Sequence, residues 1–452
     1  MIFVDPDAAR TLYKREMFDR AFFTRKPTSR GRILLLLTAA TLLAGLGRDG
    51  IAAATPEIRG FLRLPNDELA IAFGAFGFGF YPALVLGGVL AELFGAGPVL
   101  LIGGAGIAVA LGLTGSAWSL TVLVLSRLML GLSAGVLLPA SAAAMAPWTP
   151  PRERGWAIGS IIVALAAGGA LAWPLFWLLR AVGGWRGGFL VMAALAGAWA
   201  LAWRLWFKPQ PGGDEAHPVA APLPVDWRGA APILALPMAL AVLQGWGMGL
   251  CQEWVPRYLL ATWHFDIKLS DWVSAASAGA MILGGLAGGI AADRSLNHSG
   301  NIRSAHQVVP GIGFLLAALS LILLPIGENQ LAIALWLGLA LFGLQAAGMM
   351  LWVFAIDIGG RHTGLTAGAV GFGLLLARLI SPLSLYGFGL PIPAMLGVPM
   401  LVLAGVLSFR LRPHIELPVL PLPPLPVPDE ARDDAADEID ALLRKSGEKE
   451  RA

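Results

Sequence analysis

Charged residues and cysteine are scarce in this sequence. Asp, Glu, Lys and Arg make up 13% of the 452 residues, whereas soluble domains carry about a quarter. With 57% hydrophobic residues and a mean hydropathy of +0.71, a soluble fold would leave much apolar surface uncovered. The single cysteine, Cys251, excludes an intrachain disulfide and a cysteine-based metal cluster. The composition therefore indicates a membrane protein rather than a soluble domain.

Enzyme motifs are missing as well. The sequence contains no HExxH zinc motif and no GxxxxGK[ST] phosphate-binding loop. Its six histidines fall in expected loops, at the margins of apolar runs or in the C-terminal tail, so they form no metal-binding set. We therefore predict that the protein is not an enzyme and that it holds no metal and no cofactor.

Long apolar runs are what the sequence does have. Runs near 20 residues, the length that crosses the hydrocarbon core of a bilayer, recur along almost the whole chain. They predict an all-α membrane protein with twelve transmembrane helices. The expected spans are 33–56, 70–91, 98–116, 120–146, 155–181, 187–207, 232–258, 272–292, 308–325, 331–357, 363–388 and 391–410.

The basic residues predict the orientation of these spans. If the N-terminus is inside, the cytoplasmic segments hold 23 of the 32 Lys and Arg residues, eight of them in the first 32 positions. Cytoplasmic loops of membrane proteins carry such an excess. We therefore expect a multi-pass protein of a bacterial inner membrane with both termini in the cytoplasm. Because the positive charge is distributed by membrane side, the net charge of +3 does not indicate a nucleic-acid partner.

Two short patterns occur twice, about two hundred residues apart. GGVLAE at Gly87–Glu92 returns as GGIAAD at Gly288–Asp293, an offset of 201 residues. The pattern Arg-x-x-Gly-x-x-x-Gly begins at Arg152 and again at Arg361, an offset of 209 residues. Such offsets predict two parallel six-helix pseudo-repeats with a substrate site between them. Gly284 and Gly288 form a small-x-x-x-small pair that we expect at the interface of the two halves.

The repeats suggest five regions. The expected regions are a basic N-terminal segment 1–32, a first half 33–207, a linker 208–231, a second half 232–410, and a Pro-rich and acidic tail 411–452.

The repeated turns resemble a signature of the major facilitator superfamily. That family has a G-x-L-a-D-R-x-G-R-type turn between helices 2 and 3 and a degenerate copy between helices 8 and 9. Here the first turn carries Glu92 for the acid, and the second keeps Asp293 and Arg294. The resemblance implies the major facilitator fold, with helices 1, 4, 7 and 10 around the substrate site. It also implies that Arg152, Arg361 and these charged residues lie in turns that act in gating.

Three further stretches resemble a branch of that family. APWTPPRERGWAIG (146–159), QEWVPRYL (252–259) and DIGGRHTGLTAG (357–368) are similar to stretches of the anion:cation symporters, which are related to the organophosphate:phosphate antiporters. The resemblance implies a secondary transporter that moves a small organic anion, of the carboxylate type, by alternating access. Two alternatives stay open: efflux of cationic or apolar compounds on the same fold, and a transport-deficient sensor or assembly protein.

Ionisable residues stranded in apolar spans are the main candidates for binding, because they usually face water-filled space. Arg48 lies eight residues before Pro56, about 12 Å from the outer end of its helix, and Arg127 lies about 10 Å deep in another. Two such arginines on helices 1 and 4 would clamp one anion through paired hydrogen bonds. The alternatives are an ion pair between Arg48 and Asp49, and an Arg127 that extends to the surface.

Other polar and aromatic residues complete the candidate set. Further substrate-binding candidates are Tyr81 on helix 2, Gln244 and Trp246 on helix 7, and Gln345 on helix 10. Arg378 on helix 11 is expected to be structural. It would either bind a carbonyl freed by Pro382 or pair with an acid on a neighbouring helix.

The mode of energy coupling is left open by the sequence. The resembled symporters carry acids just before the helix 1 arginine and in helix 4, where this chain has Gly47 and Ala134. Asp49 is the candidate coupling acid, with H⁺ or Na⁺ as the ion, and facilitated diffusion or exchange is an alternative. We expect a monomer in the lipid bilayer.

Overall fold

The computed structural model of the protein describes residues 27–179, 181, 183–207, 225–256, 267–326, 330–386 and 392–413, with 415, 417 and 418. Most of the expected N-terminal segment, most of the linker and the tail beyond residue 418 lie outside the described residues. The five regional boundaries therefore remain predictions.

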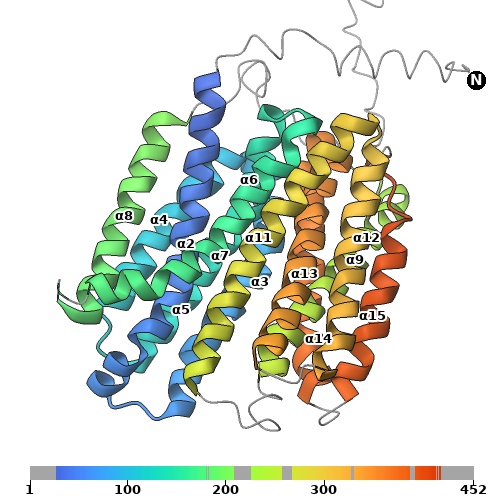
Figure 1. Ribbon diagram of the computed structural model, residues 1–452. Coiled ribbons are helices and arrows are strands. Elements are labelled where there is room, and N and C mark those ends of the chain that lie inside the picture. Colours follow the sequence, from blue (N-terminus) through green and yellow to red (C-terminus); the bar gives the residue numbers. More distant parts are fainter. Residues whose placement is uncertain are drawn as a thin grey trace, which may run out of the picture.

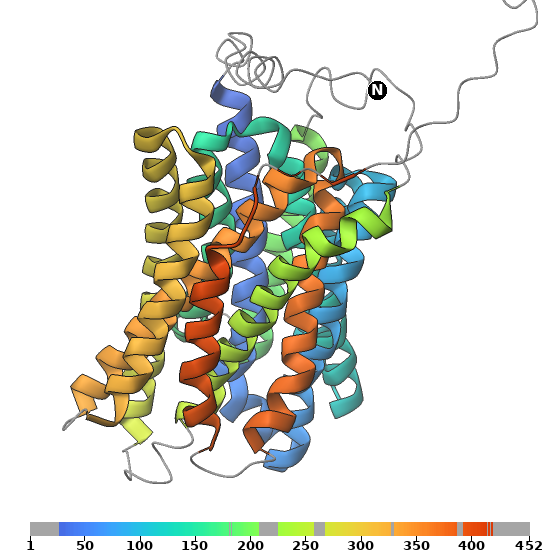
Figure 2. The ribbon, with the colours of Figure 1, turned by 90° about the vertical axis from the view of Figure 1, so that its right-hand side faces the viewer.

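Long helices joined by short connections make up the described chain, and Figures 1 and 2 show them side by side in one bundle. The helices are α2 (Pro27–Leu62), α3 (Asn66–Phe94), α4 (Ala96–Gly115), α5 (Leu120–Gly135), α6 (Leu137–Met145), α7 (Arg154–Leu179), α8 (Gly184–Trp206), α9 (Trp227–Gly249), α11 (Ile267–Ser299), α12 (Ile302–Leu323), α13 (Gln330–Gly359), α14 (Thr363–Tyr386) and α15 (Ile392–Ser408). Short 3₁₀ or π turns are η2 (Ala146–Trp148), η3 (Pro151–Glu153), η5 (Leu250–Trp254), η6 (Leu324–Ile326) and η7 (Gly360–His362).

These helices are long and apolar enough to cross a membrane. The described residues contain ten such stretches, and the last of them, Gln330–Ser381, holds α13 and most of α14. A shorter apolar helix, Gly397–Ser408, follows. The protein is thus an all-helical, multi-pass membrane protein, and the count of twelve spans stays a prediction.

Helix α2 is longer than its predicted span. It continues through Pro56 and ends at Leu62 instead of near residue 56. Transmembrane helices tolerate the loss of a backbone N–H donor at a proline. Ile58, which follows Pro56, is fully buried. Packing therefore extends the helix. Arg48 lies fourteen residues from its end, which is about 21 Å at 1.5 Å per residue, deeper than the predicted 12 Å.

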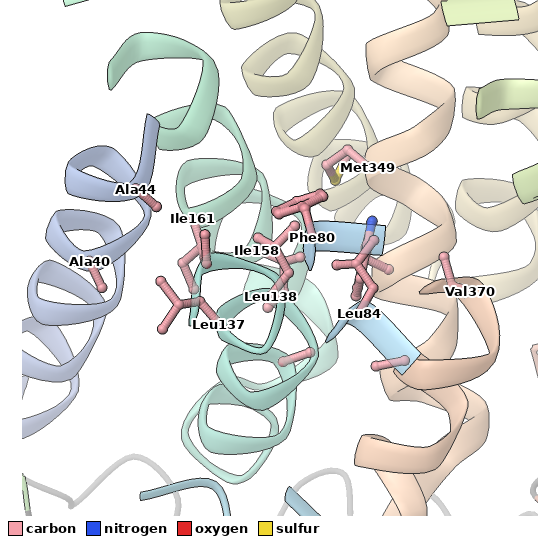
Figure 3. Packing of buried hydrophobic residues seen from close by; sticks show 14 of the residues in the cluster. Ala40, Ala44, Phe80, Leu84, Leu137, Leu138, Ile158, Ile161, Met349 and Val370 are labelled. Carbon is pink, nitrogen blue, oxygen red and sulfur yellow. The ribbon is translucent and has the colours of Figure 1, made fainter. Parts of the chain in front are cut away.

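A continuous apolar core joins the part of the chain before the linker to the part after it. Figure 3 shows buried side chains of α2, α3, α6 and α7 next to those of α13 and α14. Glycines allow the closest approach within the first part. A Cβ at Gly45 would collide with the carbonyl oxygen of Leu165 on α7, and one at Gly168 with that of Leu42 on α2. Direct backbone contact of this kind fixes α2 on α7.

The glycines of α11 face two different helices. A Cβ at Gly288 would lie 2.9 Å from the Cα of Ala346 on α13, and one at Gly284 would collide with the same helix. Their close contact was predicted correctly, but their expected place between the halves was wrong, because α11 and α13 both follow the linker. The neighbouring pair, Gly285 and Gly289, is the one that packs on α7.

Candidate functional site

Chain direction distinguishes two ends of the bundle. Helix α2 begins at the proximal end and ends at the distal end. Helices α3 and α11 end at the proximal end, where α7 and α14 begin. The proximal end corresponds to the side predicted to be cytoplasmic.

Arg48 and Asp49 form an ion pair in the middle of α2. Arg48 donates from Nε to Asp49 Oδ1 at 2.9 Å and from Nη2 to Oδ2 at 2.7 Å. The pairing is the one that the sequence offered as the alternative to a substrate contact. The two side chains are nevertheless 35% and 36% exposed. Because charged side chains at this depth avoid lipid, that exposure indicates water-accessible space inside the bundle.

Glycine on the neighbouring helix makes room for this pair. A Cβ at Gly169 of α7 would collide with Asp49 Oδ2 and would lie 3.1 Å from Arg48 Nη2. The glycines of α2 itself have a different role. A Cβ at Gly47 would meet Leu111 at 2.8 Å, and one at Gly50 would meet Phe176 at 2.6 Å. The space beside these two glycines is therefore filled by helix packing.

Arg127 is buried beside Arg48, with 1% of its surface exposed. Its Nη1 donates to the carbonyl oxygen of Gly47 at 2.7 Å, and its Nη2 donates to that of Arg48 at 2.6 Å. The guanidinium also lies 5.6 Å from the ring centroid of Phe76. Arg127 therefore neither extends to the surface nor presents its fork to a ligand in this conformation. It fixes the backbone that carries Arg48.

A second arginine–carboxylate pair lies on helices after the linker. Arg378 of α14 donates through Nη1 to Glu253 of η5, as expected for a partner on a neighbouring helix. These side chains are 39% and 31% exposed. Tyr81 of α3 interacts electrostatically with Arg378, Arg48 and Glu253. It therefore lies where the two pairs approach each other.

The remaining candidates are buried between helices. Gln244 and Gln345 are each 8% exposed. The amide of Gln244 packs against Gly348 of α13, where a Cβ would lie 2.6 Å from its Nε2. Trp246 is buried against Gly397 of α15. The structure thus brings Arg48, Asp49 and Tyr81 together in accessible space. It does not do so for Arg127, Gln244, Gln345 or Trp246.

Glu92, in the last turn of α3, contacts the first turn of α14. Its carboxylate lies against the backbone of Gly364 and Leu365, so that a Cβ at Gly364 would be 2.9 Å from Oε2, and it lies 2.5 Å from Nδ1 of His362. An acid there satisfies N–H groups that have no partner within the helix and interacts favourably with the helix dipole. A Cβ at Gly88 would collide with the carbonyl oxygen of Gly364, so the two backbones touch.

Asp293 makes the equivalent contact in the second repeat. Its carboxylate accepts from the backbone N–H groups of Gly155 and Trp156 at 2.9 and 2.8 Å, in the first turn of α7. A Cβ at Gly289 would collide with the carbonyl oxygen of Gly155. Both repeated acids therefore cap a helix of the other part of the chain, and both do so at the proximal end.

Sequence reasoning missed a third proximal contact. Arg154 of α7 pairs with Asp357 of α13, and Nε2 of His306 on α12 lies 2.5 Å from the same carboxylate. Asp357 stands in the DIGGRHTGLTAG stretch, and Arg154 in APWTPPRERGWAIG. An acid in the first stretch and a base in the second were the sequence signal that could have indicated this ion pair. The motif arginines named instead, Arg152, Arg361 and Arg294, are exposed.

Residues 37–382 match the family model described as Major Facilitator Superfamily. The chain belongs to the major facilitator superfamily. Among its superfamily relatives, "Probable sulfoacetate transporter SauU" of Cupriavidus necator is 28% identical over 371 residues, 78% of this chain and 86% of that protein. "Probable anion transporter 3, chloroplastic" of Arabidopsis thaliana is 24% identical over 77% of this chain and 72% of its own length. The "Galacturonate transporter" of Dickeya chrysanthemi is 27% identical over 52% and 72%.

Solved structures of the major facilitator superfamily share the fold. The proton:xylose symporter XylE, bound to 6-bromo-6-deoxy-D-glucose, superposes with a TM-score of 0.68 at 14% identity, over 85% of this chain and 96% of that one. A variant of the E. coli fucose:proton symporter FucP gives a TM-score of 0.66 at 11% identity, over 85% and 99%. At these identities the match shows the fold alone.

Helix packing explains one sequence pattern that is otherwise typical of hydrolases. Gly131–Gly135 has the spacing G-x-S-x-G but lies inside α5, not at the strand-to-helix turn that exposes a nucleophile. A Cβ at Gly131 or Gly135 would collide with backbone oxygens of Phe76 and Phe80 on α3. The family and its relatives' names indicate a transporter rather than an enzyme.

Proposed function

We propose that the protein is a secondary transporter of a small organic anion, with a carboxylate or sulfonate group, and that it works by alternating access. The observation that carries this proposal is a guanidinium 35% exposed in the middle of a membrane-spanning helix, at Arg48. The names of the relatives agree in the class of substrate. The proposal includes twelve spans in two six-helix halves, with both termini on the cytoplasmic side of a bacterial inner membrane.

Arg48 anchors the anion in this proposal. Asp49 occupies the Nε–Nη2 edge of the guanidinium, and an entering carboxylate or sulfonate competes for the same fork. Once displaced, an ionised Asp49 would stand unpaired inside the span, which is costly. Taking up a proton removes that cost. Asp49 therefore supplies a route for H⁺ symport, and Arg127 holds the α2 backbone while the exchange occurs.

The proximal contacts define the conformation. Glu92 and Asp293 join the two parts of the chain at that end, while Arg48 and Asp49 remain accessible in the middle. In this proposal the structure is closed toward the cytoplasm and open toward the outside. Transport requires the two helix caps to break as the halves rock.

Uptake into proteoliposomes tests the proposal. Wild-type protein should accumulate a labelled small carboxylate or sulfonate, faster with an inward proton gradient if Asp49 couples transport. Arg48→Lys keeps the charge but loses the planar fork, so it should lower affinity about tenfold or more. Transport of a cation instead would favour efflux, and transport of no tested solute would favour the sensor alternative. Wild-type uptake by Arg48→Lys and Arg48→Ala would leave Arg48 as a structural partner of Asp49.

A further inference from the structure

The second arginine–carboxylate pair, Arg378 and Glu253, resembles the first pair in its surroundings. Each pair lies inside a membrane-spanning stretch or at its end, and each is about one-third exposed. A purely structural ion pair between η5 and α14 has no need for that exposure, which costs free energy within a membrane unless water reaches it. The exposure therefore indicates that water reaches both guanidinium groups.

Tyr81 connects the two pairs. The Cζ of Arg378 lies 6.0 Å from the centroid of the Tyr81 ring. Arg48 interacts electrostatically with the same tyrosine, as does Glu253. A molecule that touches Tyr81 thus lies near one arginine of the part before the linker and one of the part after it.

The exposed polar groups of the second part decide what kind of molecule fits. Gln244 and Gln345, which would bind the hydroxyl groups of a sugar acid, are buried between helices. In that part the accessible pair is Arg378 with Glu253. Of the two, the guanidinium of Arg378 is the group that binds carboxylate, sulfonate or phosphate groups through paired hydrogen bonds.

We propose that Arg378 is a second anion anchor, and that the substrate is a compact dianion held between Arg48 and Arg378. This inference rests on the proposed function. A dianion engages both parts of the chain at once and draws their distal ends together, whereas a monoanion engages Arg48 alone. Glu253 plays for Arg378 the part that Asp49 plays for Arg48, since it keeps the guanidinium paired until the anion arrives.

Binding to purified wild-type protein is the first test. Sulfoacetate and malonate are the dianions, acetate and methanesulfonate are the matched monoanions, and glucuronate is the hydroxyl-rich monoanion. We expect the dianions to bind about tenfold or more tightly than either class of monoanion, as one added charge-assisted contact implies. Equal affinities, or a preference for glucuronate, overturn the inference while leaving anion transport intact. Binding of no anion at all refutes the proposed function itself.

A double variant tests the residue. Arg378→Gln with Glu253→Gln removes both charges together, so it leaves no uncompensated charge inside the protein. Dianion affinity should fall to the monoanion level, and monoanion affinity should stay unchanged. The matched control, Arg30→Gln with Glu153→Gln, removes an ion pair at the proximal end and should leave the dianion preference unchanged. A double variant that folds and keeps the preference overturns the role of Arg378. If the double variant does not fold, the wild-type comparison decides.

Discussion

Arg127→Lys separates a structural arginine from a substrate-binding one. Arg127 donates two hydrogen bonds to successive carbonyl oxygens of α2, at 2.7 and 2.6 Å. A lysine has one terminal nitrogen and no planar fork, so it cannot reach both carbonyl oxygens with the geometry of the guanidinium. Hydrogen bonds between transmembrane helices contribute about 0.6 kcal/mol on average and up to about 1.7 kcal/mol. With the gap left by the smaller head group, the free energy of unfolding should fall by about 1–3 kcal/mol.

Thermal unfolding of the purified protein without ligand measures this loss. Arg127→Lys should unfold at a lower temperature, and its anion affinity should also fall because the backbone at Arg48 is less firmly held. Arg186→Lys is the control: Arg186 donates to the carbonyl oxygen of Ala117 at 2.7 Å from a partly exposed position, so its loss should matter less. Unchanged ligand-free stability together with lost anion binding would refute the structural role and restore the two-arginine clamp.

Three other substitutions test packing and the proximal contacts. Gly288→Leu should prevent folding, because even a Cβ would lie 2.9 Å from the backbone of Ala346; a normal yield of monodisperse protein would contradict this. Glu92→Gln should weaken the cap of α14 by about 1 kcal/mol and increase labelling of cysteines introduced at the proximal end, and unchanged labelling would show that the cap does not hold this end. Asp357→Asn should cost about 3 kcal/mol, since it leaves Arg154 without its buried partner, and chemical unfolding that matches wild type would contradict that.

Periodic features of the sequence predicted the fold. The length of the apolar runs predicted the helices. The repeated glycine–acid stretches predicted equivalent contacts, since Glu92 and Asp293 each contact the first turn of a helix of the other part. Their assignment to turns was wrong, because 87–92 lies inside α3 and 288–293 inside α11. The reason is local. A glycine permits two backbones to approach closely, and an acid four or five residues later reaches the first turn of the neighbouring helix.

Side-chain orientation limited the prediction of the site. Depth along a helix placed Arg48 and Arg127 at similar levels, but depth does not tell which face a residue occupies. Arg48 lies in accessible space, and Arg127 points at the backbone of α2. Ion pairs between distant segments were equally hidden, since Arg154 and Asp357 are separated by 203 residues and each had other possible partners.

Helix α7 links the proposed anion site to the proximal contacts. Its Gly169 lies against the Arg48–Asp49 pair, and its Gly155 lies against α11 and the carboxylate of Asp293. Fourteen residues of one helix separate these points, about 21 Å. A tilt of α7 that follows the exchange of Asp49 for an anion must therefore displace its first turn relative to α11.

A ligand shifts a conformational equilibrium only as far as its affinities for the two states differ. Moving a two-state equilibrium from 99:1 to 1:99 takes about 5.5 kcal/mol of differential binding. Two helix caps, at about 1 kcal/mol each, oppose opening of the proximal end together with the Arg154–Asp357 ion pair. An anion that engages both parts of the chain at the distal side can supply such a difference.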